Sequence, residues 1–326
     1  MTRAQDARDP APAVGPTFGA EVMATGVVSV GLHLVRAGGL TEALSVALLV
    51  VAALLWVLLC ALFLERLLRE PHRWRDEAST PAALTGVAAT GVLGTRLTLA
   101  GGAEAGAVLL VVAFVLWAVL LPAVLGRLRG RLPGAAYLVC VSTQSLAVLA
   151  ATVAPPLHAG WLMWPALVAF VVGVLLWLLV VARFDWRQLA VGRGDHWVAG
   201  GSVSISALAA SRLVADSAPL RWAPVLHGAL RGLALALVLF AFAWYAVLVV
   251  CEVRWPRPGY DVRRWSTVFP LGMTSVAAIT CGAAERAPWL TSAGKVLLWP
   301  AVLVWGVVAA GAVRTQVHAN RKAHGR

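Results

Sequence analysis

Two kinds of hydrophobic segment alternate along the chain, and they differ in the residues that accompany the apolar ones. One kind carries Gly, Ser and Thr among its apolar residues and comprises residues 22–34, 82–101, 135–154, 198–213 and 265–282. The other consists mainly of Leu, Val, Ala and Trp and comprises residues 43–64, 106–126, 160–182, 228–251 and 297–313. Most of these segments are long enough to cross the hydrocarbon core of a bilayer as a helix. The pattern therefore predicts ten transmembrane helices.

The alternation also predicts how these helices are arranged. Gly, Ser and Thr favour positions among neighbouring helices or beside water, whereas Leu and Val favour contact with lipid. We therefore expect an all-α polytopic membrane protein in which five helical hairpins surround a central pore, each giving one inner and one outer helix. Close packing explains any single small residue equally well, as in the spacing of Gly86, Thr90 and Gly94.

Composition excludes a soluble domain. Of the 326 residues, 60% are hydrophobic and 13% are charged, whereas about a quarter of a soluble domain is charged. Most of the Lys and Arg residues behind the net charge of +12 gather near the two ends and in alternate loops, around residues 66–75, 127–131, 183–193 and 254–264. This distribution follows the positive-inside rule and predicts that both termini lie in the cytoplasm of a bacterial inner membrane. No nucleic-acid partner is needed to explain the charge.

The two ends of the chain are expected to lie outside the membrane domain. Residues 1–17 lack the compact apolar stretch of a signal peptide and are predicted to form a disordered cytoplasmic tail. Residues 18–314 form the transmembrane domain, and residues 315–326 a basic cytoplasmic tail. None of the four cysteines belongs to a CxxC pair, so we expect no disulfide, no metal site and no cofactor.

Charged residues within the membrane are few. No Asp or Glu falls in the middle third of a predicted helix, which disfavours cation-coupled binding at the midplane. Arg96 lies about 6 Å of helix rise from the outer end of its segment, and it is a candidate for attracting anions together with Arg36. Snorkelling of the side chain to the outer headgroups explains Arg96 almost equally well.

Hydroxyl and amide groups supply further candidates, because a pore needs weak and repeated binding. Thr25, Ser29, His33 and Arg36 fall on one stripe at helical spacing. At most two of the residues 142–145 can face inward together. For a single Ser, a hydrogen bond to its own helix is the better explanation. The candidate pore-lining residues are Thr25, Ser29, Thr90, Gln144, Ser204, Ser266 and Met273.

The most unusual local sequence is 265-WSTVFPLGMTS-275. Pro270 cannot donate to the carbonyl of Ser266 and is expected to kink the helix. Phe269 would then stand at the bend, where a bulky ring can plug a narrow path. From the residues alone, an ordinary packing role explains Phe269 better.

Three segments resemble the tellurite-resistance/dicarboxylate transporter family, which includes guard-cell slow anion channels and yeast malate and sulfite carriers. They are residues 23–34, 194–209 and 260–277. The resemblance implies a ten-helix fold around a pore, commonly a homotrimer, in which the Phe of a WSxxFPL pattern, here Phe269, occludes the path. The sequence departs from the family pattern at Glu21, where an apolar residue is usual, and at residues 198–201, so the resemblance leaves the substrate open.

Together these features predict an anion channel or facilitator that passes small inorganic anions or dicarboxylates such as malate. The alternative on the same fold is a proton-coupled C4-dicarboxylate or sulfite exporter with His33 as its titrating group. A membrane-embedded enzyme would draw on Asp185, Asp195 and His196, together with the loop acids near His72, and these residues show no metal-ligand spacing. A structural or sensory membrane protein is a further open class.

Overall fold

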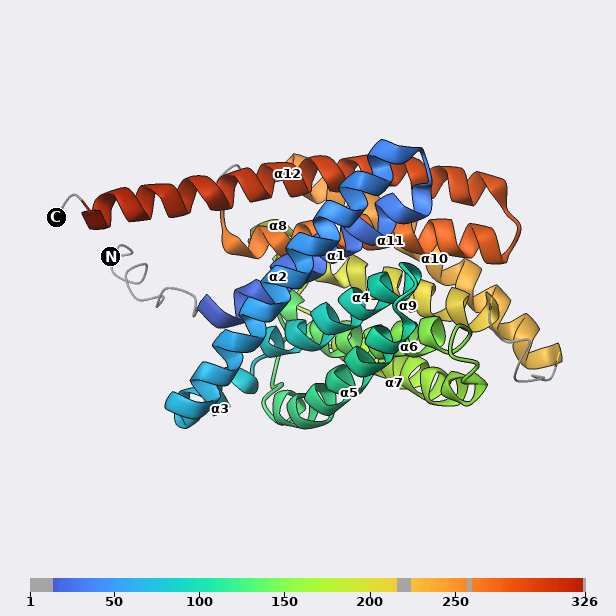
Figure 1. The fold of residues 1–326 in the computed structure, drawn as a ribbon, viewed down its shortest axis with the longest axis horizontal. Coiled ribbons are helices and arrows are strands. Elements are labelled where there is room, and N and C mark those ends of the chain that lie inside the picture. The colour runs from blue at the N-terminus through green and yellow to red at the C-terminus, as the bar shows by residue number, and fades with distance from the viewer. Residues whose placement is uncertain (1–13, 216–223, 257–259, 325–326) are drawn as a thin grey trace.

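The protein is built from membrane-spanning helices. The computed structural model describes residues 14–215, 224–256 and 260–324, and ten of their helices are long and apolar enough to cross a membrane, as the sequence predicts (Figure 1). These helices are α1 (Val14–Val35), α2 (Gly39–Arg69), α4 (Thr85–Leu99), α5 (Ala103–Leu125), α6 (Leu138–Val153), α7 (Met163–Val181), α9 (Val198–Ala215), α10 (Pro224–Arg254), α11 (Trp265–Ala284) and α12 (Pro288–His324).

Short helices connect or precede the long ones. Two of them are α-helical, namely α3 (Pro71–Ala78) and α8 (Gln188–Val191). Single 3₁₀ turns lead into α4, α6, α7, α9 and α11; they are η1 (Pro81–Leu84), η2 (Gly134–Tyr137), η3 (Gly160–Leu162), η4 (Asp195–Trp197) and η6 (Val262–Arg264). Pro71 and Pro81 each stand at the first position of a helix, where the missing N–H costs no hydrogen bond.

Burial confirms the division into inner and outer helices. In α1, α4, α6, α9 and α11, between 72% and 100% of the most apolar stretch is buried inside the protein. In α2, α5, α7, α10 and α12 the buried share is only 11% to 28%. The outer helices expose large apolar side chains such as Leu54, Val111 and Leu175. In a membrane these side chains contact lipid.

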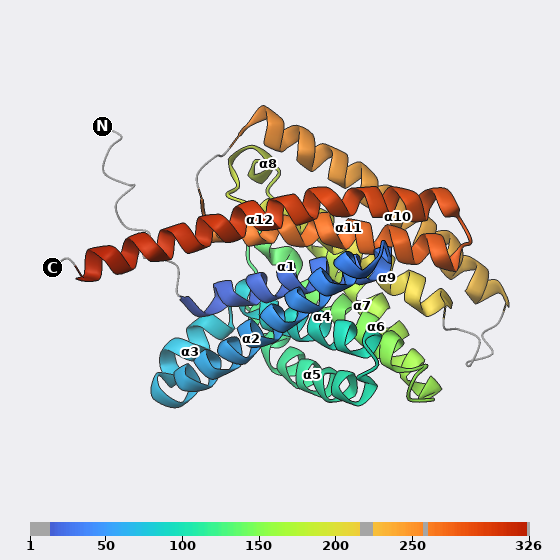
Figure 2. The same ribbon diagram turned by 45° about the horizontal axis from the view of Figure 1, so that its top comes forward.

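The inner helices form a closed ring. Each inner helix packs against the outer helix that follows it, which gives the five predicted hairpins. Around the ring the order is α1, α4, α6, α9 and α11, and α11 returns to α1. In both ribbon views α11 and α12 run side by side over most of their length (Figures 1 and 2).

Small residues allow the inner helices to approach one another. A Cβ atom added to Gly91 would lie 2.8 Å from the Cβ atom of Ser145 on α6, and one added to Gly272 would lie 2.8 Å from a methyl group of Val27 on α1. At Gly94 the same atom would lie 2.8 Å from a methyl group of Leu149. These separations are shorter than Cβ atoms tolerate, so close packing requires Gly at these positions.

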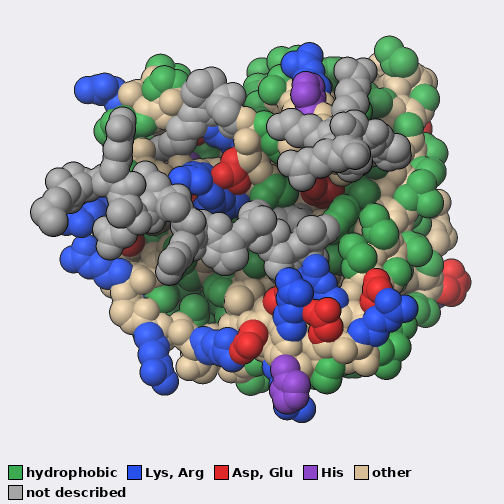
Figure 3. Space-filling view, turned by 90° about the vertical axis from the view of Figure 1, so that its left-hand side faces the viewer, with side chains coloured by type: hydrophobic (Ala, Val, Ile, Leu, Met, Phe, Trp, Pro, Cys, Tyr) green, Lys and Arg blue, Asp and Glu red, His purple; other side chains and the backbone are tan. Residues whose placement is uncertain are grey.

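Both ends of the membrane domain lie on one side. Helix α1 begins and α12 ends at the same end of the molecule, which we call the terminal face and which includes α3 and residues 126–133 (Figure 1). Figure 3 looks onto the terminal face, where Lys and Arg side chains gather beside Asp and Glu. Of the predicted tail 1–17, residues 1–13 lie outside the described residues, and Val14–Thr17 belong to α1. The predicted tail 315–326 is helical as far as His324.

The contact between α11 and α12 can be tested at Gly294. A Cβ atom there would lie 2.8 Å from the backbone N of Ile279 and 2.8 Å from the backbone O of Ser275, and Ser275 Oγ donates to the carbonyl of Gly294 at 2.7 Å. Gly294→Ala must separate the two helices, so we expect a loss of about 1–3 kcal/mol in unfolding free energy. Thermal unfolding in detergent, followed by circular dichroism, measures it as a lower melting temperature.

Gly306→Ala is the matched control on the same helix, because no described atom lies within 4 Å of the added Cβ. This control is expected to be neutral or to gain up to about 1 kcal/mol, since Ala favours the helix over Gly. Equal melting temperatures for the two variants would contradict the close contact.

Candidate functional site

The ring of inner helices surrounds a narrow cavity of about 20 Å³, to which all five helices contribute. Its polar lining side chains, Thr95 and Ser145, donate to carbonyls of their own helices, those of Gly91 and Ser142, at 2.9 and 2.7 Å. The cavity is therefore apolar in character. Its lining residues are Val27, Val30, Gly91, Val92, Thr95, Ser145, Val148, Ile205, Leu208, Met273 and Val276.

These residues occupy equivalent positions in the five hairpins. One set consists of Val27, Val92, Ser145, Ile205 and Met273. A second set lies three residues further along each helix and consists of Val30, Thr95, Val148, Leu208 and Val276. Four residues before the first set, and thus on the same helix face, stand Met23, Ala88, Val141, Gly201 and Phe269. The common spacing supports an axis through the cavity that relates the hairpins.

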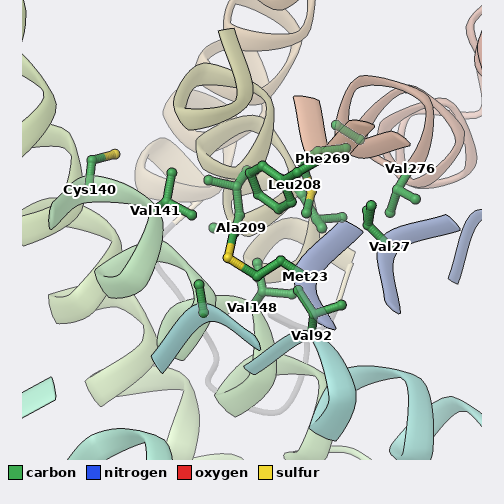
Figure 4. Close-up of a cluster of buried hydrophobic side chains, with 14 of the residues drawn as sticks. Met23, Val27, Val92, Cys140, Val141, Val148, Leu208, Ala209, Phe269 and Val276 are labelled. Atoms are coloured by element: carbon green, nitrogen blue, oxygen red, sulfur yellow. The ribbon is translucent and has the colours of Figure 1, made fainter. Parts of the chain in front are cut away.

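Phe269 is the aromatic residue of this third set, and it lies on the axis side of α11. Its side chain is 2% exposed, and two of its ring carbons lie 3.0 and 3.1 Å from the position of a Cβ atom added to Gly201. Figure 4 shows the ring beside Leu208, with Met23 and Ala209 close by. Because Phe269 precedes Met273 by one helical turn, about 6 Å of rise, the ring lies between the cavity and the terminal face.

Helix α11 continues past Pro270 from Trp265 to Ala284. Because Pro270 has no N–H, the carbonyl of Ser266, a half-buried residue, lacks its usual helical donor. The kink that the sequence predicts at Pro270 stays a prediction. Thr274 Oγ donates to the carbonyl of Pro270 at 2.8 Å and lies 2.8 Å from Ser204 Oγ on α9. Ser204 therefore connects α9 to α11 one turn from Phe269.

Three threonines of the inner helices point toward tryptophans of outer helices. Thr25 Oγ accepts from the indole N–H of Trp305 on α12 at 3.1 Å. Thr90 Oγ accepts from Trp56 on α2 at 2.9 Å, and Thr143 Oγ accepts from Trp117 on α5 at 2.8 Å. Each bond joins an outer helix to the inner helix of the next hairpin around the ring. The three threonines are again equivalent, two residues after Met23, Ala88 and Val141.

Ser29 and Gln144 also lie at contacts between helices. Ser29 Oγ donates to the carbonyl of Ser45 on α2, and Ser45 Oγ donates to the carbonyl of Ser29, each at 2.7 Å. Gln144 Nε2 donates to the carbonyl of Phe170 on α7 at 3.1 Å. Of the seven predicted lining residues, only Met273 lies among the residues that line the cavity. Thr25, Ser29, Thr90 and Gln144 instead use their polar atoms to join helices.

Arg96 is completely buried near the end of α4 that faces away from the terminal face. Its Nε lies 3.2 Å from the hydroxyls of both Ser29 and Ser45, and one Nη donates to Ser45 Oγ at 2.9 Å and to Glu42 Oε1 at 3.3 Å. Glu42 also lies 3.0 Å from His33 Nδ1. The other Nη of Arg96 is buried and has no hydrogen-bond partner within the described part of the chain. The charge of Arg96 is thus balanced by Glu42.

Arg36 does not continue the stripe of Thr25, Ser29 and His33. Helix α1 ends at Val35, and Arg36 is exposed in the connection to α2 with a φ of 50°. Its guanidinium is therefore displaced from the helix face on which the sequence pattern placed it. Its exposure leaves it available to anions from solution.

The sequence interpretation missed the cluster of His33, Glu42 and Arg96, whose members lie on three different helices. One signal was present, since Glu42 is an acidic residue at the start of an otherwise apolar segment. For the enzyme alternative, Asp185, Asp195 and His196 lie in the connection between α7 and α9. Among residues 14–215, 224–256 and 260–324, no three His, Cys, Asp or Glu side chains come close enough to hold a metal ion.

Comparison with known proteins adds two findings. A family model described as "Voltage-dependent anion channel" matches residues 13–313, which is nearly the whole chain. Two uncharacterized membrane proteins of Mycobacterium tuberculosis, one from strain CDC 1551 and one from strain H37Rv, are each 33% identical to the chain over 138 residues. The matched region is 40% of this chain and 68% of each relative.

The pairing of Glu42 with Arg96 gives a prediction about stability. Glu42→Gln leaves a buried guanidinium without its compensating charge, and hydrogen bonds to charged groups contribute about 1.5–3 kcal/mol. Because the Glu42 side chain is 47% exposed, solvent screening reduces this contribution, and we expect a loss of about 1–2 kcal/mol in unfolding free energy. The measurement is the melting temperature of the purified protein in detergent.

Glu104→Gln serves as the control, because Glu104 is an exposed carboxylate in the first turn of α5. Its change is expected to stay within about 0.5 kcal/mol, the size of a weak helix-dipole effect. If both variants have the melting temperature of the wild type, the pairing of Glu42 with Arg96 does not contribute to stability.

Proposed function

The chain belongs to the voltage-dependent anion channel family, and from this membership we propose that it passes small anions along the axis of its inner helix ring. The proposed substrates are inorganic anions such as chloride and nitrate, and dicarboxylates such as malate. We propose a transport protein, not an enzyme, and a homotrimeric assembly, which rests on the family resemblance of the sequence.

The observation that carries the proposal is the position of Phe269. Its ring is buried on the axis side of α11, while Gly201 on α9 supplies the space that the ring fills. Met273 and Val276, the next residues on the same helix face, line the cavity. We propose that Phe269 closes the path in the observed state and that anions pass when the ring moves away. Pro270 supplies the local freedom of the backbone for that movement.

The electrostatics of the axis favour conduction over tight binding. The cavity has no charged lining residue, and the buried charge of Arg96 is balanced by Glu42. A pore conducts when ions bind weakly enough to leave, and an apolar constriction blocks ions until water enters it. We propose that Arg36 and the basic groups of the terminal face enrich anions at the two mouths.

We propose an orientation with the terminal face in the cytoplasm of a bacterial inner membrane. Most Lys and Arg residues of the loops lie in the loops that share a side of the membrane with the two termini. The positive-inside rule assigns that side to the cytoplasm. Both termini are then cytoplasmic.

A proton-coupled exporter of C4-dicarboxylates or sulfite is the second candidate, and the contact of His33 with Glu42 favours it. His33 Nδ1 lies 3.0 Å from a carboxylate that also binds the buried Arg96, so a proton on His33 would alter the balance of this cluster. In a channel, the current reverses at the anion equilibrium potential without a pH gradient. Uptake into vesicles that requires a pH gradient would favour the exporter.

Replacing Phe269 tests the path and the gate together. We expect the wild type to be silent or nearly silent in planar bilayers, and Phe269→Ala to carry an anion-selective current. Burial of the Phe269 side chain stabilises the closed state by about 1.5–3 kcal/mol. The increase in chloride or nitrate current should therefore be at least about tenfold. Malate currents measured in the same bilayers place dicarboxylates inside or outside the substrate range.

Phe114→Ala is the matched control, since Phe114 lies on the exposed face of α5 with 55% of its surface accessible. It should leave the current unchanged. Equal currents in both variants would remove Phe269 from the gating role. If the wild type and Phe269→Ala both carry no current but vesicles that contain them still take up labelled malate or sulfite, the protein is a carrier and not a channel. The absence of flux in every assay would contradict a transport function.

A further inference from the structure

A second and larger cavity lies away from the ring axis, between the outer helices α2 and α5. Its volume is about 180 Å³. Trp56 and Phe63 of α2 line one side, and Leu116 of α5 lines the other. Its floor is formed by Ala83 and Gly86, at the start of α4. Because these floor residues are small, the inner helix does not fill the gap between the two outer helices.

The cavity faces the region that lipid occupies. On both sides of the gap the outer helices expose apolar side chains, such as Val57 on α2 and Val115 and Val119 on α5, each more than half exposed. Hydrocarbon surrounds such surfaces in a membrane. A void of this size contrasts with the close packing of protein interiors. The group available to fill it is an acyl chain.

The length of the cavity fits one leaflet. Trp56 and Arg66 both line it, and ten residues of helix separate them, which corresponds to about 15 Å. The hydrocarbon core of a bilayer is about 30 Å thick. The cavity therefore runs from the headgroup region at the terminal face to about the middle of the membrane.

The end of the cavity at the terminal face carries hydrogen-bond donors. Arg66 and Glu77 form an ion pair there, and Arg73 lies 3.5 Å from the same Glu77 carboxylate. The indole N–H of Trp74 is buried, and no described residue accepts its hydrogen bond. A phosphate group at this end of the cavity would lie next to the two guanidinium groups, which also contact Glu70 and Glu77. Trp residues favour this depth of the membrane.

We propose that this cavity, the α2–α5 pocket, binds one phospholipid from the leaflet at the terminal face. One acyl chain lies along Phe63 and Leu116 toward Trp56, and the phosphate lies beside Arg66 and Arg73. The lipid completes the wall that the small residues of α4 leave open. The proposal is independent of which anion the protein passes.

Native mass spectrometry of the protein with added phosphatidylglycerol tests the pocket. No described atom lies within 4 Å of a Cβ atom added to Gly86, so Gly86→Leu adds its side chain at an open position and reduces the volume of the pocket. We expect this variant to retain one lipid fewer per chain than the wild type. Gly306→Leu makes the same change on the lipid-facing surface of α12 and should retain the wild-type number. Equal retention in all three proteins would overturn the proposal.

Cys60 allows a second measurement on the wild-type chain. This measurement tests whether the pocket binds phospholipid even if Gly86→Leu does not fold. Cys60 lines the pocket and is exposed, whereas the other three cysteines are buried. Added phosphatidylglycerol should slow its modification by N-ethylmaleimide several-fold.

Two results of the Cys60 measurement would contradict the lipid site. Protection that grows with protein concentration in the absence of lipid would make the pocket a contact between copies of the chain. Equal modification rates with and without phosphatidylglycerol would show that the pocket takes no phospholipid.

Discussion

Five helices can close a ring around one axis only where neighbouring backbones come close, and the rest of this structure depends on that constraint. Gly91 against Ser145 and Gly272 against Val27 show how little space the contacts leave. Large side chains are therefore excluded from these contacts. They lie on the outer helices, as Trp56, Trp117 and Trp305 do, or they project onto the axis, as Phe269 does. The position of Phe269 on the axis and the closeness of the helices have the same origin.

The same constraint decides what the polar residues of the inner helices do. A hydroxyl group in a low-dielectric environment needs a partner, and the nearest ones are a carbonyl of its own helix or an indole N–H of an outer helix. Thr90 uses both, since it donates to Gly86 and accepts from Trp56. Arg96 finds its partners on α1 and α2. The cavity on the axis is lined mainly by apolar side chains, and the hydroxyls of Thr95 and Ser145 there bond to carbonyls of their own helices.

The architecture could be predicted from the sequence, because the amino-acid composition of each segment indicates whether its helix contacts lipid or other helices. The ten helices, the hairpins and the inner and outer classes follow from the alternation of segments. The rotation of each inner helix could not be predicted, since all its faces are buried and small residues occupy several of them. Thr25 and Thr90 were therefore expected on the axis, although they face tryptophans that are distant in sequence. Met273, which follows Phe269 by one turn, lines the cavity.

The hydrogen bond between Trp305 and Thr25 spans 280 residues of sequence and joins the last hairpin to the first. During synthesis the chain emerges from its amino-terminal end, and a contact of this separation forms only when nearly the whole protein has been made. Until α11 and α12 have entered the membrane, one side of α1 lacks its neighbours. A chain shortened within α12 would lack part of the outer helix that packs against both α11 and α1.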